Sequence, residues 1–282
     1  MAKKGWIFLG VLVCAIGAAG VRRPESKAGT HPRQEELASV LKKAGDYCAR
    51  LDLITLHFVC IEDVTEKIYE PYRVLGQVAH WKTERNNFIY DFQMIRKGAI
   101  EERRVLLREN DKPLRLENAA LKTQRFRYKY IVFGALGLFG ADEQSHYRYR
   151  VEREETLWGR QTIVVHAIPV TAADSLYVWG KAWLDAADGS ILKIEWAEES
   201  LENYGDIQAF AAGLKAKPDL KFSSEFQFYK NGIRFPSQFT MNEGYREESP
   251  SSNLRRFEKS ELAVIWRDYK FFTVEVESKI IR

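Results

Sequence analysis

The chain has 282 residues and a formal net charge of +4, from 43 lysines and arginines against 39 aspartates and glutamates. This near balance lacks the strongly basic face that nucleic-acid binding requires, so we expect no nucleic-acid partner. A hydrophobic content of 45% is enough for a sizeable core. No stretch after residue 21 approaches the roughly 18 apolar residues of a membrane-spanning helix.

The first 20 residues have the layout of a secretory signal peptide. Lys3 and Lys4 precede an uncharged run, and small residues fill positions 18–20 before Arg22 and Arg23. We therefore predict a signal peptide over residues 1–20 and a mature protein that is periplasmic or secreted. An uncleaved N-terminal membrane anchor is the alternative.

The rest of the chain divides into a short tether and one domain. Residues 21–33 are polar and contain two prolines, which predicts a flexible tether. Residues 34–282 contain no linker rich in proline, glycine or serine, and they predict a single domain.

The first predicted element of that domain is an amphipathic helix over residues 34–51. Apolar residues recur there with helical spacing, at Leu37, Leu41, Ala44 and Cys48. The opposite face is charged, so we expect one side of the helix to cover a core.

Most of the chain after this helix alternates apolar and polar residues with a period of two, which is typical of antiparallel strands. The predicted strands are 55–69, 81–96, 101–108, 114–117, 145–157, 161–169, 176–184, 190–196, 221–229, 233–241 and 257–276. Asn231-Gly232 is the strongest hairpin signal, because both residues tolerate the positive φ of a two-residue turn. Residues 122–140 and 198–216 break the alternation.

These elements predict an α+β fold. So many consecutive strands must curl or close to protect their edges. We therefore expect a strongly curved antiparallel sheet of about ten or eleven strands, a half-barrel, with the N-terminal amphipathic helix and one or two helical insertions on its concave side.

Four segments resemble, in the same order, LolA-like outer-membrane lipoprotein-sorting proteins of the periplasm. They are the helix over 34–51, Phe-Ile-Tyr-Asp-Phe at 88–92, residues 180–195 with an Asp-Gly turn, and Asn-Gly-Ile-Arg-Phe-Pro-Ser at 231–237. The resemblance covers most of the mature chain and leaves 122–140 without a counterpart. It implies a half-barrel that shelters acyl chains or other apolar ligands, in a superfamily that includes sensors and scaffolds as well as carriers.

Large apolar side chains share one face of several predicted strands. The candidate lining of a ligand cavity is Phe88, Tyr90, Phe92, Met94, Phe226, Phe228, Phe235 and Phe239. A barrel of about ten strands encloses more space than its own side chains readily fill, which favours a cavity. An ordinary packed core is the alternative.

Residues 122–140 combine a basic, aromatic half with a glycine-rich apolar half. The basic half is suited to anionic head groups, and the apolar half to a mobile flap over a ligand. The candidate flap residues are Phe133, Leu136, Leu138 and Phe139. The alternative is a solvated strand followed by a buried crossover.

Cys48 and Cys60 remain after removal of the signal peptide. Cys48 lies on the apolar stripe of the helix and Cys60 on the apolar face of a strand, so both are expected at one helix–sheet interface. In an oxidising compartment they can form a disulfide, and two buried free thiols are the alternative. Their spacing, without nearby histidines, does not suit a metal site.

The sequence offers no recognisable catalytic motif. The five histidines are scattered, and there is no nucleophile elbow, phosphate loop or dinucleotide fingerprint, so we assign no catalytic residue and no cofactor. The leading hypothesis is a non-enzymatic binding protein for a lipid, a lipoprotein acyl chain or another amphiphile, with transient contact to a membrane surface. The alternatives are an interaction, sensor or scaffold protein with a packed interior, and a hydrolase with an unrecognised site.

Overall fold

The structure, a computed structural model, describes residues 34–54, 58–72, 80–97, 99–126, 128, 134–171, 179–201, 203–247 and 256–272. All of them belong to one compact unit, His31–Arg282. The predicted signal peptide and the tether lie outside the described residues. Within the described ranges, no helix has the length and apolar character needed to cross a membrane.

Helices are few. They are α1 (Gln34–Ile54), α2 (Gly134–Phe139) and α3 (Tyr204–Gly213), with the short 3-10 helices η2 (Gln144–His146) and η4 (Glu198–Ser200). The strands are β1 (Phe58–Tyr72), β2 (His80–Lys97), β3 (Ala99–Glu109), β4 (Lys112–Leu116), β5 (Tyr147–Leu157), β6 (Arg160–Pro169), β7 (Gly180–Asp185), β8 (Ile191–Trp196), β9 (Ala216–Glu225), β10 (Phe228–Lys230), β11 (Ile233–Phe235), β12 (Gln238–Glu247) and β13 (Arg256–Phe271).

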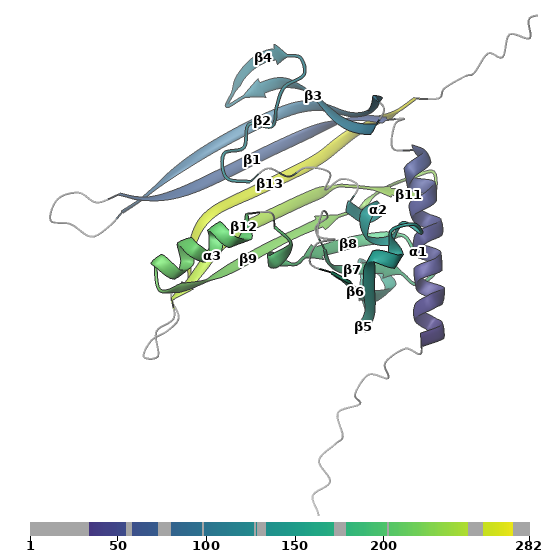
Figure 1. The fold of residues 1–282 in the computed structure, drawn as a ribbon. Coiled ribbons are helices and arrows are strands. Elements are labelled where there is room, and N and C mark those ends of the chain that lie inside the picture. The colour runs from purple at the N-terminus through teal and green to yellow at the C-terminus, as the bar shows by residue number, and fades with distance from the viewer. Residues whose placement is uncertain are drawn as a thin grey trace, which may run out of the picture. The chain divides into compact units, whose positions relative to one another are not determined.

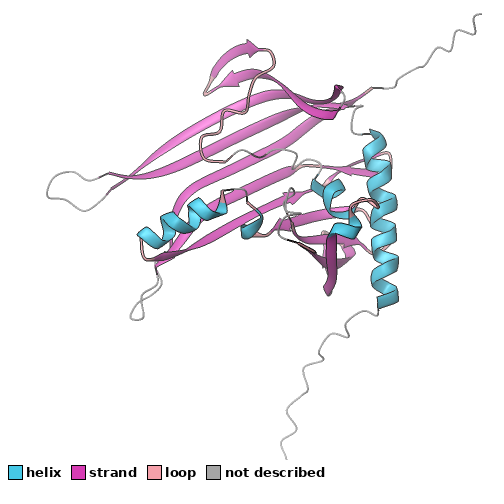
Figure 2. Ribbon diagram, in the orientation of Figure 1, coloured by secondary structure: helices cyan, strands magenta, loops and turns pink. Residues whose placement is uncertain are grey.

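Eleven strands form one antiparallel sheet, in the order β4-β3-β2-β1-β13-β12-β9-β8-β7-β6-β5 (Figure 1). The pairing of β1 with β13 joins the two ends of the described chain, so the first and the last strand lie side by side in the middle of the sheet. The sheet curves and does not close, because β4 and β5 remain as edges (Figure 2). The predicted α+β fold with a strongly curved antiparallel sheet is confirmed.

Alternation along the strands buries one face of the sheet. In β1 the even-numbered side chains from Phe58 to Ile68 are buried, and in β2 so are those from Asn86 to Met94. We call this buried side the inner face. Its apolar residues belong to one continuous core, to which α1, α2 and α3 also contribute.

Two predicted strands are each divided in two. Residues 221–229 become β9 and β10, and residues 233–241 become β11 and β12, because β10 and β11 leave the main sheet as a separate hairpin. The turn between them has Asn231 at φ 52° and Gly232 at φ 78°, as the Asn-Gly signal predicts. Pro236 follows β11 and has no N–H to continue a ladder.

The turn between β7 and β8 packs against α1. Gly189 has φ 71°, and a Cβ there would lie 2.5 Å from the backbone carbon of Lys43. Lys43 Nζ donates to the Ala186 carbonyl at 2.8 Å, and the Tyr47 hydroxyl donates to the Arg234 carbonyl at 3.0 Å. Glycine is therefore required both by the backbone conformation and by the closeness of the helix.

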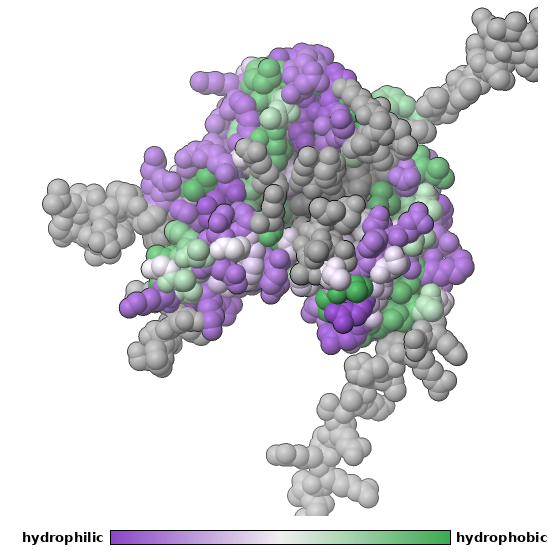
Figure 3. Space-filling model, viewed as in Figure 1, coloured by the Kyte–Doolittle hydropathy of each residue, from purple (hydrophilic) through white to green (hydrophobic). Residues whose placement is uncertain are grey.

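Three kinds of segment cover the inner face. The pair α1 and α2 lies toward β5 and β11, α3 contacts β9, and an irregular segment after β4 crosses β2, β1 and β13 (Figure 1). In the same view, which faces the helices, the surface of the described residues is mainly hydrophilic and has smaller apolar areas (Figure 3). Phe210 and Leu214, in and just after α3, are exposed.

Candidate functional site

The irregular segment that crosses the inner face is the candidate site's cover. We call it the strap and define it as residues 119–126 together with Tyr128. The strap begins after β4, where Ala119 N–H donates a hydrogen bond to the Arg104 carbonyl at 2.9 Å. Further on, Lys122 N–H donates to the Tyr90 hydroxyl at 3.2 Å. The strap forms neither a helix nor a strand, so it does not pair with the sheet by a backbone ladder.

Glu66 of β1 holds the middle of the strap. Its carboxylate accepts hydrogen bonds from Gln124 N–H at 3.0 Å and from Arg125 N–H at 2.9 Å. The Glu66 side chain is buried on the inner face. A charged acceptor therefore satisfies two successive backbone donors of the strap, and such bonds are stronger than neutral ones.

Glu243 of β12 holds the side chain of the same arginine. Arg125 Nε and Nη2 donate to its two oxygens at 2.7 and 2.5 Å, and Ser260 Oγ donates at 3.0 Å. The Tyr245 hydroxyl is a further donor. Burial acts to raise the pKa of Glu243, but the hydrogen bonds from Arg125 and Tyr245 hold it below its usual range.

A second buried ion pair lies beside the strap on the inner face. Arg104 of β3 donates through Nε and Nη2 to the two oxygens of Glu62 at 2.6 and 3.0 Å, and through Nη1 to Glu102 at 2.9 Å. The Glu62 side chain is completely buried, and this burial raises its pKa although Arg104 acts to lower it. The guanidinium lies 4.9 Å from the ring of Phe92 and 5.8 Å from the ring of Tyr128.

Tyr128 is the strap's largest inner contact. Its ring lies 5.8 Å from that of Phe239 and 6.4 Å from that of Trp266. Its hydroxyl is buried and has no hydrogen-bond partner in the part of the chain that the structure describes.

The eight residues predicted to line a cavity lie in different parts of one core. Five share the inner face of β2 and β12, and the strap contacts two of these, Tyr90 through Lys122 N–H and Phe239 through the Tyr128 ring. The Phe92 ring lies against the Arg104 guanidinium of β3. Phe228 and Phe235 instead stack with Phe58, Tyr269 and Phe271, with centroid separations from 4.7 Å upward. Phe88, Met94 and Phe226 are buried in the same core.

Three of the four predicted flap residues belong to α2, which packs into the core. Leu138 and Phe139 are completely buried in α2, Leu136 is half-buried there, and Phe133 lies outside the described residues. The Tyr149 hydroxyl donates to the Leu138 carbonyl at 2.5 Å, which anchors α2 to β5. The described part of the glycine-rich half, Gly134–Phe139, is thus buried in α2, in agreement with the alternative of a buried crossover that the sequence left open.

The two cysteines are buried free thiols in the structure, so the disulfide is replaced by its alternative. Cys48 Sγ donates to the Ala135 carbonyl of α2 at 3.6 Å, whereas the Cys60 thiol lies beside Tyr269 of β13. The two thiols therefore meet different elements. Burial raises the pKa of Cys48 to about 12 and also raises that of Cys60, which disfavours the reactive thiolate.

The sequence analysis did not identify the buried carboxylates that hold the strap. A signal for them was present, because Glu62 and Glu66 interrupt the inward-facing series of Cys60, Val64 and Ile68. Glu243 does the same between Met241 and Tyr245. A charged residue at an inward position of a strand is costly unless it is paired, so it points to a buried partner.

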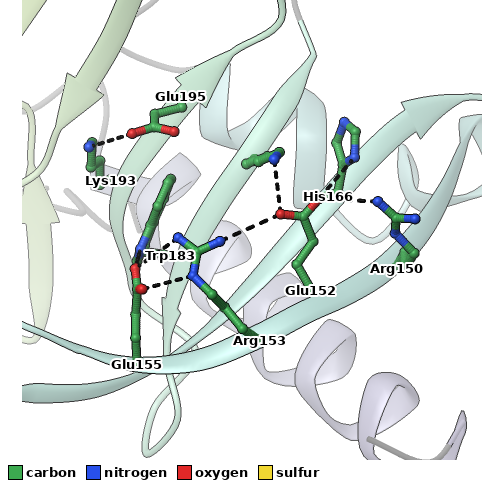
Figure 4. A network of polar contacts seen from close by, with 9 residues as sticks. Arg150, Glu152, Arg153, Glu155, His166, Trp183, Lys193 and Glu195 are labelled. Atoms are coloured by element: carbon green, nitrogen blue, oxygen red, sulfur yellow. Dashed lines mark hydrogen bonds and ion pairs between the residues drawn. The ribbon is translucent and has the colours of Figure 1, made fainter. Parts of the chain in front are cut away.

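A second polar network lies on the outer face of β5 to β8 (Figure 4). Glu152 contacts Lys181 at 3.0 Å, Arg150 at 3.2 Å and His166 Nδ1 at 3.5 Å. Burial lowers the pKa of His166.

Trp183 occupies the centre of that outer face. Its ring covers the small cluster of Val164 and Leu192, which is separate from the main core. Arg153 lies 5.7 Å and Lys193 4.9 Å from the ring, a cation–π arrangement that shields the indole from water (Figure 4). This arrangement explains why a tryptophan is nearly buried on the outer side of the sheet.

Among the described residues, no group of three or more histidines, cysteines and acidic residues is placed to hold a metal ion. The site beneath the strap offers aromatic surface together with carboxylate acceptors. Chemically, such a site is suited to non-covalent binding of a molecule that is largely apolar and partly polar.

No protein-family model and no curated protein matches the sequence. Three solved structures are similar in fold. A LolA superfamily protein from Nitrosomonas europaea has 11% identity and a TM-score of 0.32, over 84% of this chain and 94% of that chain. A DUF1329 family protein from Desulfovibrio piger has 12% identity and a TM-score of 0.36, over 82% and 93%. A putative outer membrane lipoprotein-sorting protein domain from Vibrio parahaemolyticus has 14% identity and a TM-score of 0.38, over 84% and 94%.

Proposed function

We propose that the protein is a non-enzymatic binding protein of the cell envelope that shelters a lipid, a lipoprotein acyl chain or another amphiphile between the inner face and the strap. One observation supports this most strongly. The strap is an irregular segment, and its middle is held by two buried carboxylates, Glu66 and Glu243, rather than by a backbone ladder.

Such a cover can be exchanged for a ligand that replaces its hydrogen-bond donors. A helix or strand would have to lose a cooperative set of backbone hydrogen bonds, whereas the strap loses its hydrogen bonds to Glu66 and Glu243 and the contacts of two aromatic residues, Phe126 and Tyr128. An acyl chain that covers the same floor recovers the hydrophobic term, at about 25 cal/mol per Å² of apolar surface removed from water.

The envelope location is supported by the sequence. The charged start, apolar run and small residues of 1–20 have the layout of an export signal. An exported binding protein for an amphiphile would carry its cargo through the aqueous space beside a membrane.

A packed interior with a protein-interaction role is the second candidate, and it has an observation of its own. Phe228 stacks on Tyr269 with a centroid separation of 4.7 Å and an interplanar angle of 8°, as in a filled core. This stack includes Phe235 and lies apart from the strap contacts. The binding role and the interaction role therefore make different predictions for substitutions beneath the strap and for substitutions in the stack.

A pair of matched phenylalanine variants separates the candidates. Phe239 and Phe235 are both 1% exposed, but only Phe239 contacts the strap. We expect Phe239→Ala and Phe235→Ala each to cost about 3–5 kcal/mol of unfolding free energy. Only Phe239→Ala should also change the affinity for an uncharged apolar fluorophore, by about tenfold.

The binding titration needs a folded sample of each variant, checked by circular dichroism at the titration temperature. Native mass spectrometry of protein purified from its own envelope gives an independent readout, as a bound mass that organic extraction removes. If neither measurement detects a ligand, and both variants change stability alone, the interaction role replaces the carrier role.

A further inference from the structure

The hydrogen bonds that the strap makes indicate which polar groups a ligand would need in order to take its place. Where the strap lies, the inner face presents carboxylates, and the strap supplies them with donors: two backbone N–H groups to Glu66 and one guanidinium to Glu243. Removing the strap removes those donors and leaves both carboxylates on an aromatic floor.

The neighbouring charges do not compensate for that loss. Arg104 is already committed to Glu62 and Glu102 through all three of its nitrogens. Arg125 lies in the basic half of 122–140, which the sequence suited to anionic head groups, but its guanidinium is bound to Glu243. With the strap displaced, the floor therefore carries an excess of negative charge in surroundings that are largely apolar.

The Tyr128 hydroxyl bears on the fit of a ligand. It is buried and has no partner among the described residues. A ligand that supplies a cation and apolar surface, without burying an unpaired hydroxyl, would fit the same floor better.

We infer that the amphiphile taken up beneath the strap has a cationic polar group, which replaces the Arg125 guanidinium at Glu243 and the backbone donors at Glu66. This inference rests on the proposed function and specifies the ligand's chemistry. An anionic head group would instead add a further negative charge beside two unpaired carboxylates, in a region where charges are weakly screened. Aromatic rings nearby, such as that of Tyr245, also favour a cation.

Three ten-carbon probes with small head groups test the inference: decylammonium, decanol and decanoate. Each is titrated into the full-length protein at pH 7.5, below its micelle concentration, by isothermal calorimetry or by displacement of an uncharged fluorophore. We expect decylammonium to bind at least tenfold more tightly than decanoate, with decanol between them. The preference should fall as salt is added.

The double variant Glu66→Gln/Glu243→Gln is the selective control, because it keeps side-chain size and removes both charges. It should reduce the preference for decylammonium over decanoate to less than threefold. The readout is this ratio of affinities, because both substitutions also weaken the hold on the strap and change the affinity for every ligand that displaces it. Glu195→Gln, on the outer face, should leave all three affinities unchanged. Circular dichroism establishes that each variant is folded before it is titrated, and Glu66→Gln alone provides a milder substitution.

The outcomes distinguish the inference from the function on which it rests. Binding of decanol with no preference for the cation, or a preference for decanoate, overturns the inference and keeps the proposed function. If the double variant prefers decylammonium over decanoate as strongly as the wild type does, the inference is also overturned, because the selectivity then does not come from Glu66 and Glu243. Binding of none of the three probes contradicts the proposed function itself.

Discussion

Individual charged residues on the inner face determine how the strap is held. Glu243 is the clearest case, because its pKa lies below its usual range although burial acts to raise it. A carboxyl group with a lowered pKa in the folded state stabilises the protein above its ordinary pKa of about 4.3, and this contribution is lost as the pH falls.

We therefore predict that Glu243→Gln lowers the unfolding free energy by about 2 kcal/mol at pH 7. The value is below the 3–5 kcal/mol typical of breaking a buried pair, because Arg125 is about one-third exposed and can be hydrated. The difference from wild type should shrink as the pH falls below about 4.3, as urea unfolding across pH 3–7 would show. An exposed-site control, Glu195→Gln, should change stability by less than about 0.5 kcal/mol. A difference that does not vary with pH would contradict the assignment.

Two tyrosines allow a matched test of the strap's fit. The Tyr90 hydroxyl accepts a hydrogen bond from Lys122 N–H, whereas the Tyr128 hydroxyl has no partner among the described residues. Tyr90→Phe should cost about 1 kcal/mol, and Tyr128→Phe should be neutral or stabilise by up to about 1 kcal/mol. Thermal unfolding of both variants measures the difference. If Tyr128→Phe lost more unfolding free energy than Tyr90→Phe, the Tyr128 hydroxyl would have a hydrogen-bond partner in the folded protein.

At the scale of elements, the contact between α1 and the β7–β8 turn is set by one glycine. Gly189 and Gly159 both have positive φ, but a Cβ at Gly159 meets no atom within 4 Å, whereas one at Gly189 meets the backbone of α1. Both alanine substitutions carry the cost of positive φ, about 1 kcal/mol. Gly189→Ala should lose about 2 kcal/mol more, because helix and turn must separate. Equal losses in chemical denaturation would show that the α1 contact adds nothing.

The elements also show how far the sequence could predict the fold. Alternation located nearly every strand, since one face of each is buried, and the Asn-Gly pair located the β10–β11 turn. The sequence did not predict that 233–241 is divided at Pro236, because both parts keep the same alternation of apolar and polar residues. This alternation indicates which side chains are buried, but it does not indicate that β11 and β12 belong to different sheets. Leu138 and Phe139, predicted in a mobile flap, are buried in α2, because composition does not reveal that α2 packs between α1 and β5.

In the molecule as a whole, the interior combines two environments. Near β10 and β11 it is filled by stacked rings, and beneath the strap it combines rings with paired carboxylates. The sequence identified the aromatic residues of both environments, but it did not show that the two environments are separate. Alternation along a strand predicts which side chains point inward, but it does not predict which side chains they contact there. The buried charges Glu62, Glu66 and Glu243 were recognisable in principle, as interruptions of apolar faces.

The central claim is that a ligand displaces the strap, and amide hydrogen exchange tests it most directly. The N–H groups of Gln124 and Arg125 donate to Glu66, so they should exchange slowly in the free protein. The N–H of Phe226, bound to the Leu192 carbonyl at 2.8 Å, is an internal reference. We predict that a saturating ten-carbon amphiphile speeds exchange at 124 and 125 by at least tenfold and leaves 226 unchanged. Unchanged or slower exchange at 124 and 125 with ligand bound would contradict the account.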